Sequence, residues 1–259
     1  MSVLTGRVLR AFLLPAVLGL GALSLASASA ADPARTRQAE PVQVPAAAAA
    51  PGLKFGFYVG DEQQPTTSRV AKLGSDITFP QGLFDGKILG FVGRVPITGK
   101  LAIPPTSSYF VSFRFMPATG DVELIPDGDA TGTVEVKTGA TTGCKAVGTN
   151  LCADSDVTNK MFIKLSNVKV DGKVLDVGPN CRTAQSVVVN IKALVPLAFP
   201  APPVKVTTTF PTPGFAGCGG REDLSPLLTG LVSGPGNTLV THLKLRCTGD
   251  GPPPNGCGA

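Results

Sequence analysis

The chain has 259 residues and a formal net charge of +5, and it is 43% hydrophobic but only 16% charged. It contains one histidine and no tryptophan. The single imidazole excludes zinc sites built from several histidines, and di-iron sites with a histidine on each of two helices. The basic residues form no clustered stripe of the kind that binds nucleic acid, so no nucleic-acid partner is expected.

The N-terminal segment has the three parts of a secretory signal peptide. Two arginines precede an apolar run over residues 11–25, and the small residues that follow offer a cleavage site after Ala30 or after Ala28. The run is shorter than the roughly 20 apolar residues that span a membrane. We expect residues 1–30 to be a signal peptide and the mature chain to have no membrane span.

Residues 31–52 are rich in alanine and proline and contain few large apolar side chains. Such a segment buries too little surface to offset the entropy cost of ordering, which predicts a disordered Ala/Pro-rich spacer. No internal repeat or second linker follows. We therefore expect residues 53–259 to form a single β-rich domain.

Short alternating runs, each bounded by glycine or proline, predict ten or so β-strands. They cover residues 53–59, 76–79, 87–95, 98–103, 109–116, 121–125, 133–137, 161–170, 186–195, 204–210 and 238–247. Within 109–116, one face would hold Val111, Phe113 and Phe115, and the other Ser112 and Arg114. The pattern is typical of a mainly β fold. It predicts an antiparallel β-sandwich or barrel-like domain.

One short C-terminal helix is predicted over residues 221–232. Ser225 would cap it and Pro226 would occupy the first helical position. The spacing of the leucines predicts one apolar face, made of Leu224, Leu227, Leu228 and Leu231.

Six cysteines follow the signal segment, an even number that predicts three disulfides in an exported chain. They are Cys144, Cys152, Cys181, Cys218, Cys247 and Cys257. Short separation favours Cys144–Cys152, and we expect Cys181–Cys218 and Cys247–Cys257 for the rest, with Cys218–Cys247 as an open alternative.

No catalytic constellation emerges from the sequence. His242 is the only imidazole, and alternation places it beside Lys244 and Arg246 on the face opposite Leu243 and Leu245. Paired carboxylates could still perform acid–base chemistry. The candidate pairs are Asp61/Glu62, Asp121/Glu123, Asp154/Asp156 and Glu222/Asp223.

Two short acidic segments resemble fragments of calcium loops, residues 127–129 (DGD) and 154–156 (DSD). Neither has the length of an EF-hand loop or its terminal glutamate, so solvated turns are the expectation and no metal or cofactor is predicted. The segment 234–236 (GPG) lacks the lysine of a phosphate-binding loop. We interpret it as the turn that ends the helix.

Several strings resemble those of a family of secreted β-rich proteins from actinobacteria. They are VKVDG (168–172), VGPNCRT (177–183), FAGCG (215–219), EDLSPLLT (222–229) and SGPGN (233–237). The likeness covers about residues 85–247 and is most distinctive from 160 to 240. It implies export from a high-GC Gram-positive bacterium and a β-rich fold, and it assigns no catalytic residue.

These observations predict an exported, non-enzymatic β-domain with a binding or structural role at or near the cell envelope. A cell-wall polymer or another envelope protein is the expected kind of partner. The mature protein would be secreted, with a fraction bound to the wall. The alternative is an extracellular hydrolase that uses carboxylates.

Overall fold

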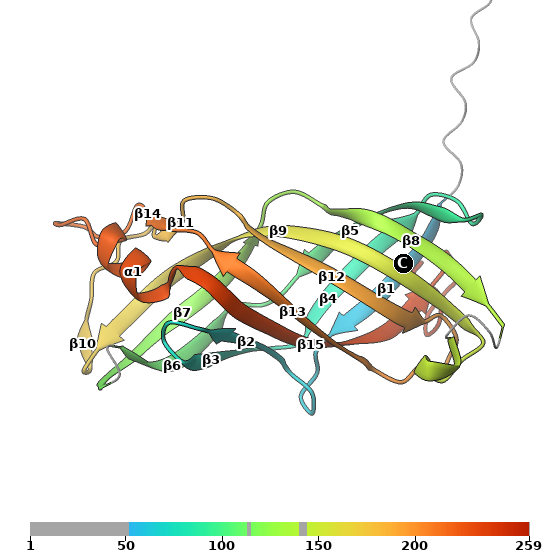
Figure 1. Ribbon diagram of the computed structural model, residues 1–259, viewed down its shortest axis with the longest axis horizontal. Helices are drawn as coiled ribbons and strands as arrows, with labels where there is room; N and C mark the ends of the chain where they lie inside the picture. Colours follow the sequence, from blue (N-terminus) through green and yellow to red (C-terminus); the bar gives the residue numbers. More distant parts are fainter. Residues whose placement is uncertain (1–51, 113–114, 140–143, 259) are drawn as a thin grey trace, which may run out of the picture. The chain divides into compact units, whose positions relative to one another are not determined.

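Antiparallel strands dominate the computed structural model, in which residues 52–112, 115–139 and 144–258 are described (Figure 1). The expected signal peptide lies outside the described residues, as does all of the expected spacer except Gly52. The elements are β1 (Leu53–Val59), β2 (Thr66–Val70), β3 (Ser75–Phe79), β4 (Gly82–Ile88), β5 (Arg94–Ala102), β6 (Thr106–Ser112), β7 (Met116–Pro126), β8 (Ala130–Thr138), η1 (Cys144–Val147), β9 (Leu151–Val170), β10 (Lys173–Val174), β11 (Arg182–Thr183), β12 (Val187–Pro196), β13 (Val204–Thr212), β14 (Phe215–Ala216), α1 (Ser225–Val232) and β15 (Gly234–Thr248).

Two long strands, β9 and β15, organise the sheet. Along one edge, β9 pairs first with β8 and then with β7, while β12 runs along its other edge. In the same way β15 pairs with β2 and then with β1 on one edge and with β13 on the other. The strands β8, β5, β4 and β1 therefore connect the two long strands at one end. At the other end lie the pairs β7–β6 and β2–β3.

The sheet curls round and encloses an apolar interior, as the interleaved strands in Figure 1 show. Side chains help to close it at two places where neighbouring strands form no ladder in the described part of the chain. The Thr106 hydroxyl of β6 donates to the carbonyl of Thr78 on β3 at 2.9 Å. The Thr208 hydroxyl of β13 donates to the carbonyl of Asn190 on β12 at 2.8 Å. The expected antiparallel, mainly β fold is confirmed.

The three disulfides join the pairs favoured by the sequence, and among the described residues no cysteine is free. Cys144–Cys152 ties η1 to the start of β9, and Cys247–Cys257 holds the C-terminal segment against β15. Cys181–Cys218 lies in a second buried cluster, with Phe215 and the α1 residue Leu228.

Several local expectations are wrong. The predicted strand 87–95 covers the end of β4, the turn at 89–93 and the start of β5, and the apolar side chains of Phe91 and Val92 in this turn are exposed. The predicted strand 109–116 likewise includes the β6–β7 turn. Its faces are reversed, because Ser112 is buried inside while Phe115 is 76% exposed; Phe113 and Arg114 lie outside the described residues.

The helix is shorter than expected and begins at Ser225. The residue before it, Leu224, makes no side-chain cap, so the expected Ser225 cap is wrong. Instead the Ser225 hydroxyl accepts a hydrogen bond from the backbone N–H of Cys218 at 3.2 Å. Leu224 and Leu228 are buried as expected, whereas Leu227 is exposed because it lies on the outer side of this single covering helix.

Candidate functional site

An apolar cavity of about 180 Å³ lies inside the curled sheet. This volume, taken as the space open to the centre of a water-sized sphere, is more than ten times the roughly 10–15 Å³ that one water molecule needs. Its walls come from β1 to β9, from β12, β13 and β15, and from α1. No acidic or basic side chain of the described residues lines it.

The cavity is also evident from side chains that point inward but are not fully buried. Ile163, Leu165, Leu239 and Leu243 point inward from β9 and β15, yet each is only half-buried. An inward residue of a filled core would be fully buried. These side chains instead pack against the buried clusters on one side and face the cavity on the other.

Buried and half-buried side chains line the cavity at both of its ends. Where β1, β4 and β12 approach the η1 end, the lining residues Phe55, Ile88 and Val195 are fully buried members of a hydrophobic cluster. Toward α1, β3 and β6, the lining residues Phe110 and Leu231 remain half-buried. At that end Phe79, Ser112 and Leu228 are buried as well, so both ends contain closely packed residues. Figure 1 shows η1 and α1 toward opposite ends of the sheet.

A few polar side chains interrupt the apolar lining. The hydroxyls of Thr66 and Thr241 hydrogen-bond to each other at 2.7 Å. The carboxamide of Asn237 accepts from the backbone N–H of Ala71 at 2.9 Å and donates to the Thr212 hydroxyl at 2.9 Å. These groups are satisfied within the protein.

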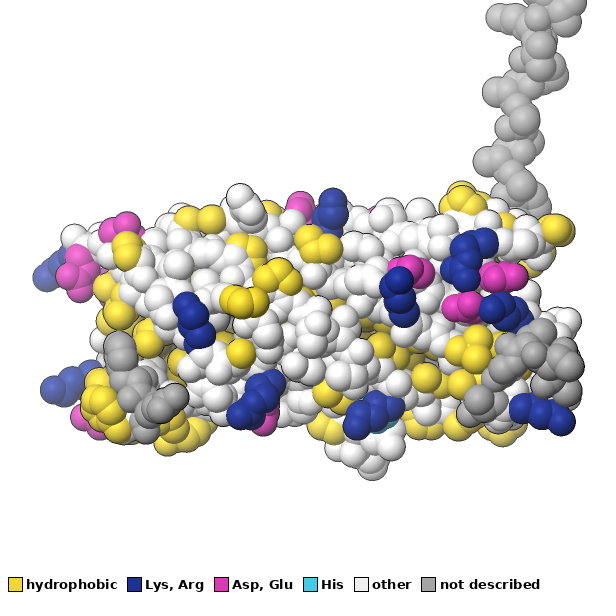
Figure 2. Space-filling model, in the orientation of Figure 1, with side chains coloured by type: hydrophobic (Ala, Val, Ile, Leu, Met, Phe, Trp, Pro, Cys, Tyr) yellow, Lys and Arg dark blue, Asp and Glu magenta, His cyan; other side chains and the backbone are white. Residues whose placement is uncertain are grey.

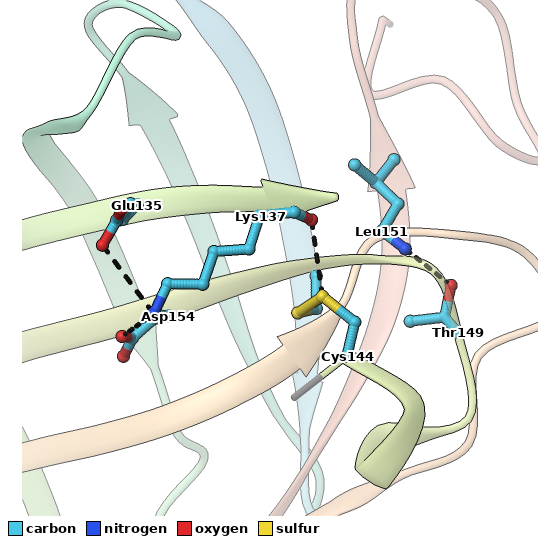
Figure 3. Close-up of a disulfide and its surroundings, with 7 residues drawn as sticks. Glu135, Lys137, Cys144, Thr149, Leu151 and Asp154 are labelled. Atoms are coloured by element: carbon cyan, nitrogen blue, oxygen red, sulfur yellow. Dashed lines mark hydrogen bonds and ion pairs between the residues drawn. A yellow bond between two sulfur atoms is a disulfide. The ribbon is translucent and has the colours of Figure 1, made fainter. Parts of the chain in front are cut away.

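The carboxylate pair Asp154/Asp156 does not face the cavity. Alternation on β9 turns both residues outward, since Ala153, Ser155 and Val157 line the interior. Figure 3 shows the carboxylate of Asp154 beside the ammonium of Lys137, 2.7 Å away. In Figure 2, acidic and basic side chains adjoin one another over this part of β8 and β9.

Ion pairing and hydrogen bonding keep these carboxylates ionised. The hydrogen bond from Lys137, with the Arg94 guanidinium at 3.1 Å, holds the pKa of Asp154 below its usual value. The hydrogen bond from the Asn190 amide, followed by that from Lys192, lowers the pKa of Asp156. A general acid at neutral pH needs a raised pKa, so neither residue is set up for that role.

Carboxylates of the other candidate pairs also form hydrogen bonds or ion pairs within the protein. Hydrogen bonds from Ser107 and then Asn167 lower the pKa of Asp121. Its neighbour Glu123 forms an ion pair with Lys164 at 3.1 Å. The carboxylate of Asp61 accepts two backbone N–H groups of its own turn.

The last pair, Glu222/Asp223, lies exposed in the segment before α1. Hydrogen bonds from the hydroxyl and backbone N–H of Ser225 lower the pKa of Asp223.

Residues 127–129 form the exposed β7–β8 turn. Among the described residues, no group of three or more potential ligands could hold a metal ion.

His242 lies on β15 between Thr241 and Leu243, both of which line the cavity, so its imidazole is on the opposite face as expected. It is half-buried, not freely exposed, and its Nδ1 makes no hydrogen bond within the described residues. Residues 234–236 belong to β15, which begins directly after the helix and pairs Gly234 with Thr212 of β13, so the expected turn at 234–236 is wrong.

Sequence reasoning missed the cavity altogether. The alternation of β9 and β15 indicates which residues face inward, but it carries no signal for whether the interior is filled.

Comparison of the chain with protein-family models, with curated proteins and with solved structures finds no match. No helix among the described residues has the length and hydropathy to cross a membrane.

Proposed function

We propose that this protein is an exported, non-enzymatic binding module of the cell envelope that holds an acyl chain or a similar elongated apolar ligand inside its sheet. The observation that carries the proposal is the cavity of about 180 Å³ with its almost wholly apolar lining. Ligand pockets are typically apolar hollows with few polar groups. The disulfides are compatible with an oxidising, extracellular location.

The energetic cost of an empty cavity supports a ligand. At about 24 cal/mol per Å³, a void of about 180 Å³ costs about 4 kcal/mol. This is a large part of the roughly 5–15 kcal/mol that stabilises a typical domain. A bound acyl chain would restore the missing contacts.

The alternative, a carboxylate-dependent hydrolase, gains no support from the site. Each candidate carboxylate with a shifted pKa has it lowered. None of the carboxylates lines the cavity among the described residues. Cleavage of a bound ligand would need such a group within reach of it.

A single introduced tryptophan tests the proposal, because the chain has none of its own. Ile191 is a half-buried lining residue of β12, and Val188 on the same strand is 47% exposed. We expect bromine-labelled stearic acid to quench the emission of Ile191→Trp and to leave that of the matched control Val188→Trp unchanged.

Leu239→Trp, at another half-buried lining position, replaces Ile191→Trp if that variant does not fold. Circular dichroism verifies the fold of each variant. Equal quenching at the inner and outer positions, or none at either, would contradict a chain bound inside. Mass spectrometry of organic extracts of the secreted protein identifies the natural ligand.

A further inference from the structure

Asn159 is the one amide among the buried polar side chains of the cavity wall that make no hydrogen bond within the described residues; the other two are the hydroxyls of Ser68 and Ser112. Asn159 lies on β9 between the inward residues Val157 and Met161, opposite Val189 of β12. Only 5% of it is exposed. It lines the main cavity and also a hollow of about 10 Å³ where β5, β7, β8 and β9 meet.

The carboxamide of Asn159 makes no hydrogen bond to any described residue, whereas that of Asn237, equally buried in the same lining, bonds to Ala71, Thr212 and Gly234. Buried polar groups in native proteins are normally paired, and an exception calls for an explanation. An amide can both donate and accept. Its direction into the cavity indicates a partner that comes from outside the chain.

We propose that Asn159 is the hydrogen-bonding site for an uncharged polar group carried part-way along the apolar ligand. This inference rests on the proposed function and adds a ligand class to it: an acyl chain with an internal hydroxyl, keto or ester group. The polar group is uncharged because no described ionisable side chain lines the cavity to compensate a buried charge.

The test compares stearic acid with a series of stearic acids that carry one hydroxyl at successive chain positions. Displacement of a fluorescent fatty acid measures their affinities for the full secreted protein. We expect at least one hydroxylated isomer to bind about tenfold more tightly than stearic acid, a ratio worth about 1.4 kcal/mol. In Asn159→Leu this preference disappears while stearic acid still binds.

Val188→Leu, a change at an exposed position of β12, is the matched control and keeps the preference. If the wild type binds every isomer no more tightly than stearic acid, the inference is wrong, and a water molecule in the small hollow is the partner of Asn159. A preference that survives in Asn159→Leu also overturns it. Failure of all chains to bind would instead refute the proposed function.

Discussion

Two buried asparagines provide a sharp test of the reasoning, because the same substitution should change the stability of the ligand-free protein in opposite directions. Asn159 is 5% exposed and has no hydrogen-bond partner among the described residues, whereas Asn237 is 2% exposed and its carboxamide makes three hydrogen bonds. Both side chains line the same cavity. Leucine is apolar and close in size, so the comparison isolates the hydrogen bonds.

The expected magnitudes follow from the partners. An unpaired buried polar group costs about 1–3 kcal/mol. Because the Asn159 carboxamide opens into the cavity and is not fully enclosed, Asn159→Leu should raise the free energy of unfolding by about 1 kcal/mol, the low end of that range. Asn237→Leu removes three bonds worth about 1 kcal/mol each and leaves the N–H of Ala71 unpaired. It should lower the free energy of unfolding by about 4–6 kcal/mol.

Guanidinium unfolding of delipidated protein with its disulfides intact measures both effects. For a domain of this size, each kcal/mol corresponds to a shift of about 2–4 °C in Tm, so thermal unfolding gives a second reading. A loss of stability in Asn159→Leu as large as that in Asn237→Leu would refute the reasoning. It would mean that the Asn159 amide is satisfied in the folded protein.

Three further predictions concern charge, disulfides and ligand. Because the pKa of Asp154 is lowered in the folded state, its ion pair with Lys137 stabilises above the unfolded pKa of about 3.9 and is lost as the pH falls through the folded pKa. Asp154→Asn should therefore reduce stability at neutral pH but not in strong acid, as urea titrations at the two pH values will show. Replacing the Cys181–Cys218 bridge, with a sequence separation of 37, by serines should cost about 4 kcal/mol, against about 2.5 for Cys144–Cys152 with a separation of 8. Equal losses in chemical unfolding would contradict that order. Stearic acid at about 100 times its Kd should add about 2.7 kcal/mol to the free energy of unfolding, and a Tm that does not change with ligand would contradict binding to the folded state.

The sequence predicts the strands best where alternation is regular and both ends are marked. β1 matches its expected bounds, and β13 and β15 lie where the β-branched and leucine-rich runs place them. The first half of β9 escapes prediction because its inward positions include Ser155 and Asn159, which break the apolar period. β2 is likewise short and polar.

Errors of orientation have a different origin. In β6, Phe110 and Ser112 face the cavity while Val111 faces outward. An assignment from hydrophobicity alone would turn Val111 inward and Ser112 outward, because it takes the more apolar face of a strand as the buried one. A cavity accepts a serine at a buried position, and the exposed Phe115 shows that apolar side chains also lie on the outside.

The candidate site itself needed the structure. Alternation assigns Ile163, Leu165 and Asn159 to the inner face, but a filled core and a hollow one have the same period. Whether the Asn159 carboxamide has a partner depends on strands distant in sequence, such as β12. Cysteine count and spacing, in contrast, predicted three disulfides and the Cys144–Cys152 pair, while the choice of Cys181–Cys218 over Cys218–Cys247 was decided by the structure.

The register of β1 on β15 has a consequence for how the protein forms. Val59 pairs with Leu243, so the first strand of the sheet, which has β4 on one edge, finds its other neighbour only in the last strand. Contacts this distant in sequence make folding slow, because a long loop must close before they form. A chain that ends before Gly234 would leave β1, β2 and β13 without their shared neighbour and would expose the apolar lining. The cavity therefore exists only after synthesis of the whole chain, and a ligand can bind inside it only at the final step of folding or later.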